Sequence, residues 1–183
     1  MKTESDKQEL RQELRWTLYA QAGDRAALDA LLERVQEPLY RYVYHLVGSQ
    51  PLAEDVLQEV FIIIYRKLKW LREPELFRPW AFRIATREAF KQLKRERRWR
   101  EASVEEDTLA EVAAPERNVF PAEWLAQLPQ LIAQLSPASR AVIVLHYLHE
   151  LPLPEIADVL GVALGTVKSR LAYGLNSLRK QWE

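Results

Sequence analysis

Apolar residues recur at intervals of three and four positions along most of this 183-residue chain, and no other feature restricts its fold as much. The clearest run contains Ala53, Val56, Leu57, Val60, Phe61, Ile64 and Leu68. Because an α-helix turns once every 3.6 residues, this spacing places all of these side chains on one stripe that faces a core. Glycine occurs only five times, which is too rare for a fold with many tight β-turns. We therefore predict an all-α chain.

The residues between the periodic segments predict where helices end and begin. Gly48-Ser49-Gln50-Pro51 is typical of a helix stop, with a new helix near Leu52. Pro74 and Pro79 predict a loop from about Trp70 to Pro79. Ser136-Pro137 is typical of a helix start, with serine as the cap and proline at the first helical position.

Charge divides the chain into segments. Residues 66–100 contain 13 Lys and Arg against 4 Asp and Glu, a net charge of +9, whereas residues 101–123 contain 1 against 7, a net charge of −6. The basic segment suits a phosphate-binding surface, because each cation near a phosphate releases condensed counterions. Helical periodicity fades through the acidic segment, as in a linker. We expect two small helical domains, over 1–100 and 124–183, joined by a flexible acidic linker over 101–123.

Composition excludes several classes of protein. Without cysteine there is no disulfide framework and no thiol nucleophile. The longest apolar run, Val60 to Ile64, is too short to cross a membrane, and the first 12 residues are charged throughout, so we expect a cytoplasmic protein without membrane insertion. No phosphate loop or nucleophile elbow is present, so an enzyme is not expected. His146 and His149 lack a third ligand nearby, and we expect no metal and no cofactor.

The helix predicted to start near Leu52 has an unusual outer face. Its first half is acidic and polar, with Glu54, Asp55, Gln58 and Glu59. Its second half is apolar, with Ile62 and Ile63. Two interpretations are open at this point. The face is either a solvated surface on a helix buried on two sides, or a docking face for a basic partner.

The last part of the chain has the pattern of a helix-turn-helix, with Gly161 between two periodic segments. On the final segment, a narrow arc that includes Val167 and Leu178 should pack on the preceding helix. The opposite arc would be free to enter a DNA major groove, and it contains Gly165, Lys168, Ser169, Ala172, Tyr173 and Asn176. Helix pairs in plain bundles share this pattern, so the pattern alone leaves DNA binding open.

Three ordered motifs resemble one family. Leu52 to Phe61 is similar to the most characteristic stretch of sigma domain 2, Trp80 to Ala85 to the DNA-facing helix of that domain, and Gly165 to Leu171 to the recognition helix of sigma domain 4. The short chain and the missing middle domain point to the extracytoplasmic-function group of RNA polymerase sigma factors. This resemblance implies a transcription initiation factor that binds promoter DNA as a subunit of the polymerase.

The resemblance also implies roles for residues and partners. The acidic face, with Ile62 or Ile63, would bind the clamp helices of the β′ subunit of core RNA polymerase. The chain would also contact the polymerase at the β flap. An anti-sigma factor is a further expected partner. The domain 2 loop and the helix after it would bind the −10 element through Phe77, Arg78, Arg83, Arg87, Lys91 and Lys94. Domain 4 would bind the −35 element through Gly165, Thr166, Lys168, Ser169, Arg170, Ala172 and Tyr173.

Some positions depart from the family pattern. Arg87 stands where many members have asparagine, and Tyr173 where an arginine is usual, so the promoter sequence should not be copied from the family. Pro152 replaces the common Ser or Thr helix cap. Two rival functions are a stand-alone regulator that binds duplex DNA through its helix-turn-helix, and a protein-binding adaptor bundle that binds no DNA.

Overall fold

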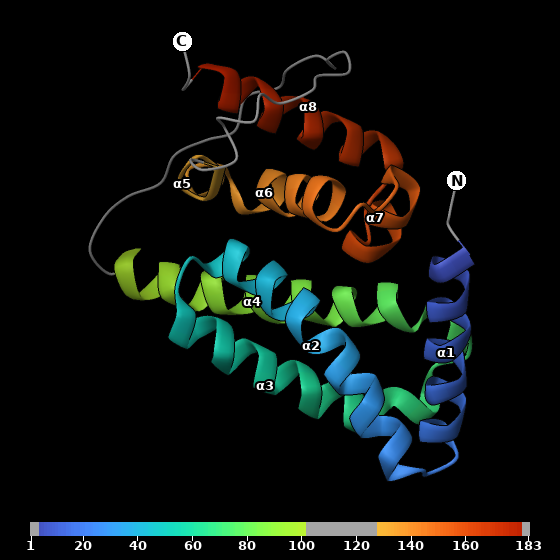
Figure 1. Cartoon of the computed structure of the whole chain (residues 1–183). Helices are drawn as coiled ribbons and strands as arrows, with labels where there is room; N and C mark the ends of the chain where they lie inside the picture. Colours follow the sequence, from blue (N-terminus) through green and yellow to red (C-terminus); the bar gives the residue numbers. More distant parts are fainter. Residues whose placement is uncertain (1–3, 102–127, 181–183) are drawn as a thin grey trace.

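The structure is a computed structural model that describes residues 4–101 and 128–180. The described residues form helices and turns without a β-strand, which confirms the all-α prediction. In Figure 1, α1 to α4 lie together as an N-terminal lobe, and α5 to α8 lie above them as a C-terminal lobe. The acidic segment expected to link the domains lies almost wholly outside the described residues.

The N-terminal lobe has four helices: α1 (Glu4–Gln21), α2 (Arg25–Val47), α3 (Gln50–Lys67) and α4 (Phe77–Glu101). Asp24 caps α2, since its carboxylate accepts a hydrogen bond of 3.1 Å from the backbone N–H of Ala27. Gly48 ends α2 in the left-handed conformation, with φ of 71°, and α3 follows after Ser49. The predicted stop and restart are therefore confirmed.

The prediction of a loop from Trp70 to Pro79 is wrong over much of its length. A 3-10 turn, η1 (Leu68–Trp70), follows α3, a second one, η2 (Pro74–Leu76), follows it, and α4 begins at Phe77. Proline is tolerated in the first turn of a helix, where its missing N–H would have no helical partner. Pro74 and Pro79 therefore stand at helix starts instead of in a loop.

The C-terminal lobe contains α5 (Leu128–Ala133), α6 (Pro137–Ile143), a π-helical turn η4 (Val144–Leu148), α7 (Leu153–Leu160) and α8 (Leu164–Lys180). The Ser136 hydroxyl accepts from the N–H of Ser139 at 3.3 Å, so the predicted cap of α6 is confirmed. Gly161 ends α7 with a φ of 66°, and the short turn to α8 completes the predicted helix-turn-helix.

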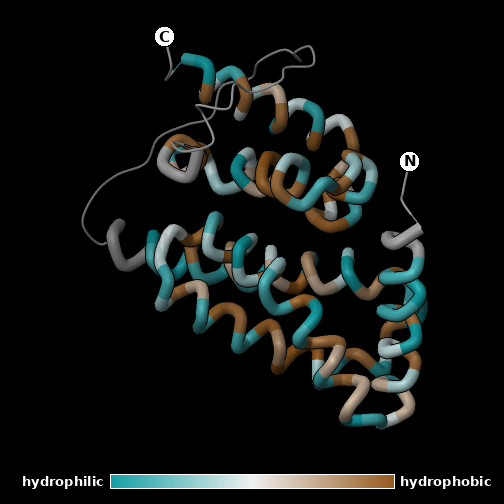
Figure 2. The backbone as a smooth tube through the Cα atoms, in the orientation of Figure 1, coloured by the Kyte–Doolittle hydropathy of each residue, from teal (hydrophilic) through white to brown (hydrophobic). Residues whose placement is uncertain are grey.

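The apolar stripes of the helices meet in a core that extends through both lobes. Figure 2 shows hydrophobic residues on the facing sides of the helices and hydrophilic residues outside. Tyr42 of α2 is fully buried, and its hydroxyl lies 2.8 Å from the hydroxyl of Thr86 on α4. Within the described ranges, no helix is both long and apolar enough to cross a membrane.

Candidate functional site

Helix α3 presents a polar face to solvent. Its apolar stripe, which includes Val56, Val60 and Ile64, is buried against α2 and α4. The side chains predicted for docking lie on the outside: Glu54, Asp55, Gln58 and Glu59 are exposed, and Ile62 and Ile63 are half-buried. One side of α3 is thus buried in the core. Its other side exposes the acidic residues to solvent, with the two isoleucines one turn further along the helix.

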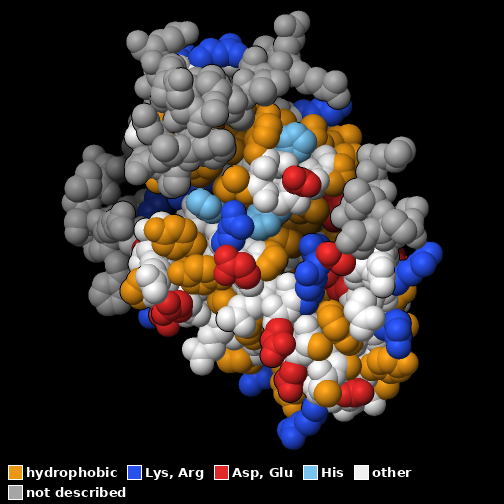
Figure 3. Space-filling model, viewed as in Figure 1, with side chains coloured by type: hydrophobic (Ala, Val, Ile, Leu, Met, Phe, Trp, Pro, Cys, Tyr) orange, Lys and Arg blue, Asp and Glu red, His pale blue; other side chains and the backbone are white. Residues whose placement is uncertain are grey.

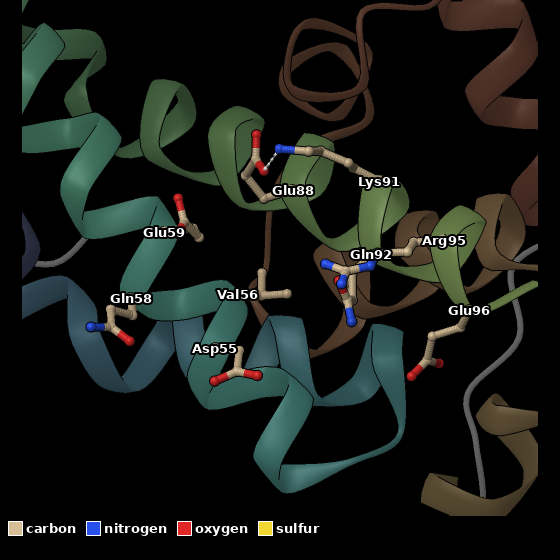
Figure 4. Close-up of a pocket in the computed structure, with 9 residues that line it drawn as sticks. All are labelled: Asp55, Val56, Gln58, Glu59, Glu88, Lys91, Gln92, Arg95 and Glu96. Atoms are coloured by element: carbon tan, nitrogen blue, oxygen red, sulfur yellow. Dashed lines mark hydrogen bonds and ion pairs between the residues drawn. The ribbon is translucent and has the colours of Figure 1, made fainter. Parts of the chain in front are cut away.

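The acidic face borders a groove of about 720 Å³ between α3 and α4. Asp55 and Glu59 line it from α3, and Lys91 and Arg95 line it from α4 (Figure 4). The Lys91 ammonium donates to Glu88 at 2.9 Å, and this hydrogen bond, followed by the charges of Glu88 and Glu59, raises the pKa of Lys91. Acidic and basic residues therefore share the groove, which makes the two surfaces neighbours rather than well-separated patches.

Two of the arginines predicted to bind DNA have partners within the protein. Arg78 donates from Nη2 to the buried carboxylate of Glu13 on α1 at 2.7 Å. Arg83 donates from Nε to the backbone carbonyl of Asp158 on α7 at 2.9 Å. Arg87, Lys91 and Lys94 are exposed along α4.

Phe77 does not lie as predicted. It was expected in an open loop, where a ring can stack on an unpaired base, but it is the first residue of α4 and only 1% exposed. Its ring lies 6.2 Å from the ring of Trp80, centroid to centroid. An aromatic ring in this position fills the core and offers no face to a ligand.

Trp70 is an exposed aromatic residue that the sequence prediction missed. It is 71% exposed, and the ammonium of Lys69 lies 4.8 Å from its ring centroid. The side-chain amide of Gln21 on α1 donates to the carbonyls of Leu68 and Leu71, at 2.9 and 2.7 Å, and so fixes the turn on both sides of Trp70. A tryptophan next to lysines, directly after a predicted helix, was a usable signal, because lysine is almost never fully buried.

Helix α8 exposes part of its predicted DNA-facing side. Gly165, Lys168, Ser169 and Tyr173 are exposed, and Thr166 and Arg170 are half-buried. The Ser169 hydroxyl donates to the Thr166 carbonyl at 3.0 Å, within the same helix. Such a side chain can exchange this local bond for one to a ligand.

Ala172 is another position that differs from the prediction, because it is completely buried. Helix α8 packs on α6 as well as on α7, so its buried arc is wider than the arc expected from one neighbour. Gly174 lies in this wider arc, where an added Cβ would come 2.6 Å from Cδ1 of Ile143. Ala172 therefore has no exposed surface with which to contact DNA in this structure.

The residues that the structure describes contain no group of three or more His, Cys, Asp or Glu able to hold a metal ion. The polar groups on the two surfaces are instead carboxylates, ammonium and guanidinium groups spread along exposed helices. Such surfaces suit docking to a macromolecule better than enclosing a small molecule.

The two lobes match separate family profiles. The profile described as Sigma-70 region 2 matches residues 31–99, and the one described as Sigma-70, region 4 matches residues 125–178. The first match covers most of α2 and all of α3, and the second contains the helix-turn-helix.

Curated relatives match over most of the chain. The ECF RNA polymerase sigma factor SigW of Bacillus subtilis is 31% identical over 169 residues, which are 87% of this chain and 90% of that protein. SigL of Mycobacterium tuberculosis is 34% identical over 172 residues, with 87% and 91% covered. SigE of Mycolicibacterium smegmatis is 35% identical over 168 residues, and this match covers 88% of the chain but only 65% of SigE.

Solved structures have the same fold. CnrH in complex with the cytosolic domain of CnrY gives a TM-score of 0.69 at 22% identity, covering 93% of this chain and 97% of that one. The sigma factor RpoE in complex with the anti-sigma factor NepR, from Bartonella quintana, gives 0.66 at 21% identity, covering 84% and 95%.

Proposed function

The chain belongs to the extracytoplasmic-function group of the sigma-70 family, and from this premise we propose which of its surfaces bind core RNA polymerase and which bind promoter DNA. We place the domain boundaries at 1–100 and 124–183, with the segment 101–123 between them. The proposed role is one of binding, in the cytoplasm, with no catalytic side chain and no metal.

The proposal depends above all on the exposed acidic face of α3. Four neighbouring polar side chains, Glu54, Asp55, Gln58 and Glu59, point away from a helix whose other side is buried. The clamp helices of the β′ subunit are the partner that we assign to this face, with Ile62 and Ile63 as its apolar edge. Carboxylates around an apolar contact give orientation and a fast encounter with a basic partner.

Promoter DNA is assigned to the cationic sides of α4 and α8. Arg83, Arg87, Lys91 and Lys94 would lie along the phosphates of the −10 region, and Arg78 would position α4 through Glu13. Opening the duplex requires favourable binding of the unpaired strand, to which stacking on exposed aromatic rings contributes. Trp70 takes this stacking role in place of the buried Phe77.

The C-terminal lobe is assigned to the −35 element and to the β flap of the polymerase. Lys168, Ser169 and Tyr173 are its exposed groove-facing residues, with the backbone N–H groups near Gly165 on a phosphate. Thr166 and Arg170 flank them. Ala172 is buried, so we no longer assign it to the surface that binds DNA. An anti-sigma factor is a further proposed partner.

The polymerase contact is tested with a charge reversal. Glu59→Arg should weaken binding to purified core polymerase at least 30-fold, because it removes a carboxylate and adds a cation facing a basic partner. Fluorescence anisotropy of the labelled chain gives the affinity, and circular dichroism checks that the helix content is unchanged. Glu37→Arg is the matched control, since Glu37 is also exposed but lies on α2 outside the proposed face.

If a folded Glu59→Arg variant bound core polymerase normally, the acidic face of α3 would not be the surface that binds polymerase. Run-off transcription then separates the rival functions. A sigma factor gives specific starts only with core polymerase. A stand-alone regulator would bind promoter DNA without it, and an adaptor would leave no footprint with or without it.

A further inference from the structure

Cations and carboxylates are interspersed on the surface of the N-terminal lobe. Figure 3 shows Lys and Arg side chains, in blue, beside Asp and Glu side chains, in red, on the face that it presents. A carboxylate next to a lysine competes with an external anion, because the ammonium must leave one acceptor to meet the other. The strength with which α4 binds phosphates therefore depends on the partner of each cation as well as on the number of cations.

Three of the α4 cations proposed for the −10 region lie on one stripe of the helix. Arg87, Lys91 and Lys94 are four and three residues apart, and side chains at these intervals project from the same side of an α-helix. All three are exposed. Of the three, Lys91 is the one that lines the groove between α3 and α4.

Glu88 holds Lys91 at this groove. Its carboxylate accepts a hydrogen bond of 2.9 Å from the Lys91 ammonium, three residues further along α4. In Figure 4 the Lys91 side chain runs back along the helix to reach Glu88. The side chain of Glu88 is 18% exposed and that of Lys91 is 75% exposed. A packed carboxylate thus restrains a cation that is otherwise surrounded by water.

The groove as a whole attracts a cation. The carboxylates of Asp55, Glu59, Glu88 and Glu96 line it, against the cations of Lys91 and Arg95. A wall with this excess of negative charge draws Lys91 inward and repels a phosphate. The hydrogen bond to Glu88, and then the charges of Glu88 and Glu59, raise the pKa of Lys91, so these carboxylates stabilise its charged form in this position.

We propose that Glu88 limits the affinity of α4 for the −10 region by competing with DNA phosphates for Lys91. The inference rests on the proposed function, since it assigns Glu88 a role at the DNA surface of α4. In the free chain the carboxylate neutralises one cation of the stripe and leaves Arg87 and Lys94 to meet phosphates. A phosphate that recruits Lys91 must break its hydrogen bond to Glu88, so this contact contributes less than it would without that neighbour.

Glu88→Gln tests the competition, because glutamine keeps the size of the side chain and removes its charge. The full chain is assembled with purified core polymerase, and the holoenzyme is bound to a labelled promoter fragment that gives a specific start in run-off transcription. The variant should bind about 2- to 5-fold more tightly at low salt, as expected for release of one exposed ion pair. Its affinity should also fall more steeply with salt, by up to about 0.9 in the log–log slope, because one more phosphate contact is made.

Glu96→Gln is the matched control, since Glu96 lines the same groove from α4 and the change removes the same charge. Its affinity and its salt dependence should equal those of the unchanged chain. Adding Lys91→Ala to Glu88→Gln should cancel the gain, because the cation that the first change releases is then absent. Circular dichroism checks that the helix content is the same in every variant.

Unchanged or weaker binding by a folded Glu88→Gln variant would overturn the proposal. A gain that persists without Lys91 would also overturn it, because Glu88 would then repel phosphates directly. An equal gain in Glu96→Gln would show that the charge of the whole groove, and not the pair, sets the affinity.

Arg87→Ala distinguishes failure of this proposal from failure of the proposed function. If α4 binds the −10 region, Arg87→Ala weakens promoter binding whatever the effect of Glu88→Gln. If both changes leave promoter binding unaltered, α4 is not the surface that binds this DNA.

Discussion

The basic side chains on α4 differ in their exposure and in their partners, although they look alike in the sequence. Arg87 and Lys94 are exposed, Lys91 is paired with Glu88, and Arg78 and Arg83 are bound to other elements of the protein. The total charge of the segment therefore overstates what is free to meet a phosphate. A mutation in this helix can act on stability, on DNA binding or on both, depending on the partner of the side chain.

Arg78→Ala should lower the free energy of unfolding by about 1–3 kcal/mol, because it leaves the Glu13 carboxylate without its cation. The side chain of Glu13 is 5% exposed and that of Arg78 37%, so the loss is smaller than for a fully buried pair. Chemical denaturation measures it, with Lys94→Ala as an exposed control that should change stability by less than about 0.5 kcal/mol.

A double-mutant cycle then assigns the loss to the pair. Adding Glu13→Gln to Arg78→Ala should recover part of the stability, since the uncompensated charge is gone. An Arg78→Ala variant as stable as Lys94→Ala would show that the pair contributes nothing to the fold.

Trp70→Ala should reduce promoter opening roughly 5- to 150-fold, the range that corresponds to about 1–3 kcal/mol for stacking of one base. A fluorescent base analogue in the non-template strand of the −10 region reports opening. Binding to core polymerase should not change, because Trp70 lies outside the acidic face. Leu76→Ala, another exposed apolar residue near α4, should open promoters normally. If the Trp70→Ala variant opened promoters normally, Trp70 would not be part of the surface that binds the unpaired strand.

At the scale of elements, spacing of apolar residues predicted most of the helices. It located α2, α3, α7 and α8, and local chemistry predicted the ends of α2 and α7 at Gly48 and Gly161 and the start of α6 at Ser136. The stretch from Trp70 to Pro79 was misjudged because proline breaks a helix interior but fits a helix start, and the sequence does not say which case applies. Phe77 was placed in a loop for this reason.

Ala172 was misjudged for a different reason. The helical wheel of α8 gives its polar and apolar sides, but small residues are ambiguous on such a wheel. Packing of α8 on a second helix, α6, buried Ala172 and Gly174 together. The exposed acidic face of α3 was easier to predict, because long charged side chains are seldom buried without partners.

Two glycines of α8 should respond in opposite ways to alanine. At Gly174 the new Cβ would approach Cδ1 of the buried Ile143 to 2.6 Å, and overpacking costs about 1–3 kcal/mol, more than the roughly 1 kcal/mol that alanine gains in a helix. At Gly165 nothing lies within 4 Å, so the same change should stabilise by roughly 0.5 kcal/mol. Thermal unfolding of the full chain compares them, and equal melting temperatures would contradict the predicted close packing of α6 and α8.

The arrangement of the whole molecule was the part that sequence could not predict. Each lobe has its own apolar pattern, and this pattern does not show that the two apolar stripes join in one core. The contact between the lobes also uses the backbone carbonyls of Leu46 and Asp158 and the ring of His149. Any residue type has a carbonyl, and a single histidine in a sequence gives no sign of the lobe it will contact.

Acidification should weaken the packing of the two lobes on each other, in which His149 lies against Phe82 of α4 and Tyr42 of α2. Burial, followed by the charges of Arg41, His45 and Arg78, lowers the pKa of His149 from 6.5 to about 4. The packed arrangement therefore favours the neutral ring, and it weakens as pH falls from about 6.5 toward 4. Between pH 7 and pH 5 the ratio of chains with separated lobes to chains with packed lobes should rise by up to about 20-fold. Energy transfer between labels on the exposed positions Gln36→Cys and Arg179→Cys follows this ratio.

His149→Gln should flatten most of this pH dependence. The remainder belongs to His45 on α2, whose pKa is lowered by burial and then by Arg41 and Arg140. A transfer efficiency that stays constant from pH 7 to pH 5 in the chain with both histidines would mean that neither histidine is coupled to the packing of the lobes.

The π-helical turn η4 makes the contact between the two lobes sensitive to the number of residues in the turn. A π-turn holds one residue more than an α-turn, and each residue of a helix rotates the next part of the chain by about 100°. Loss of one residue between Val144 and Leu148 would restore regular winding and swing His149 off Phe82 and Tyr42. Both lobes would keep their own folds, yet they would no longer fit each other. One residue more or less in this turn therefore decides whether the two lobes can pack together.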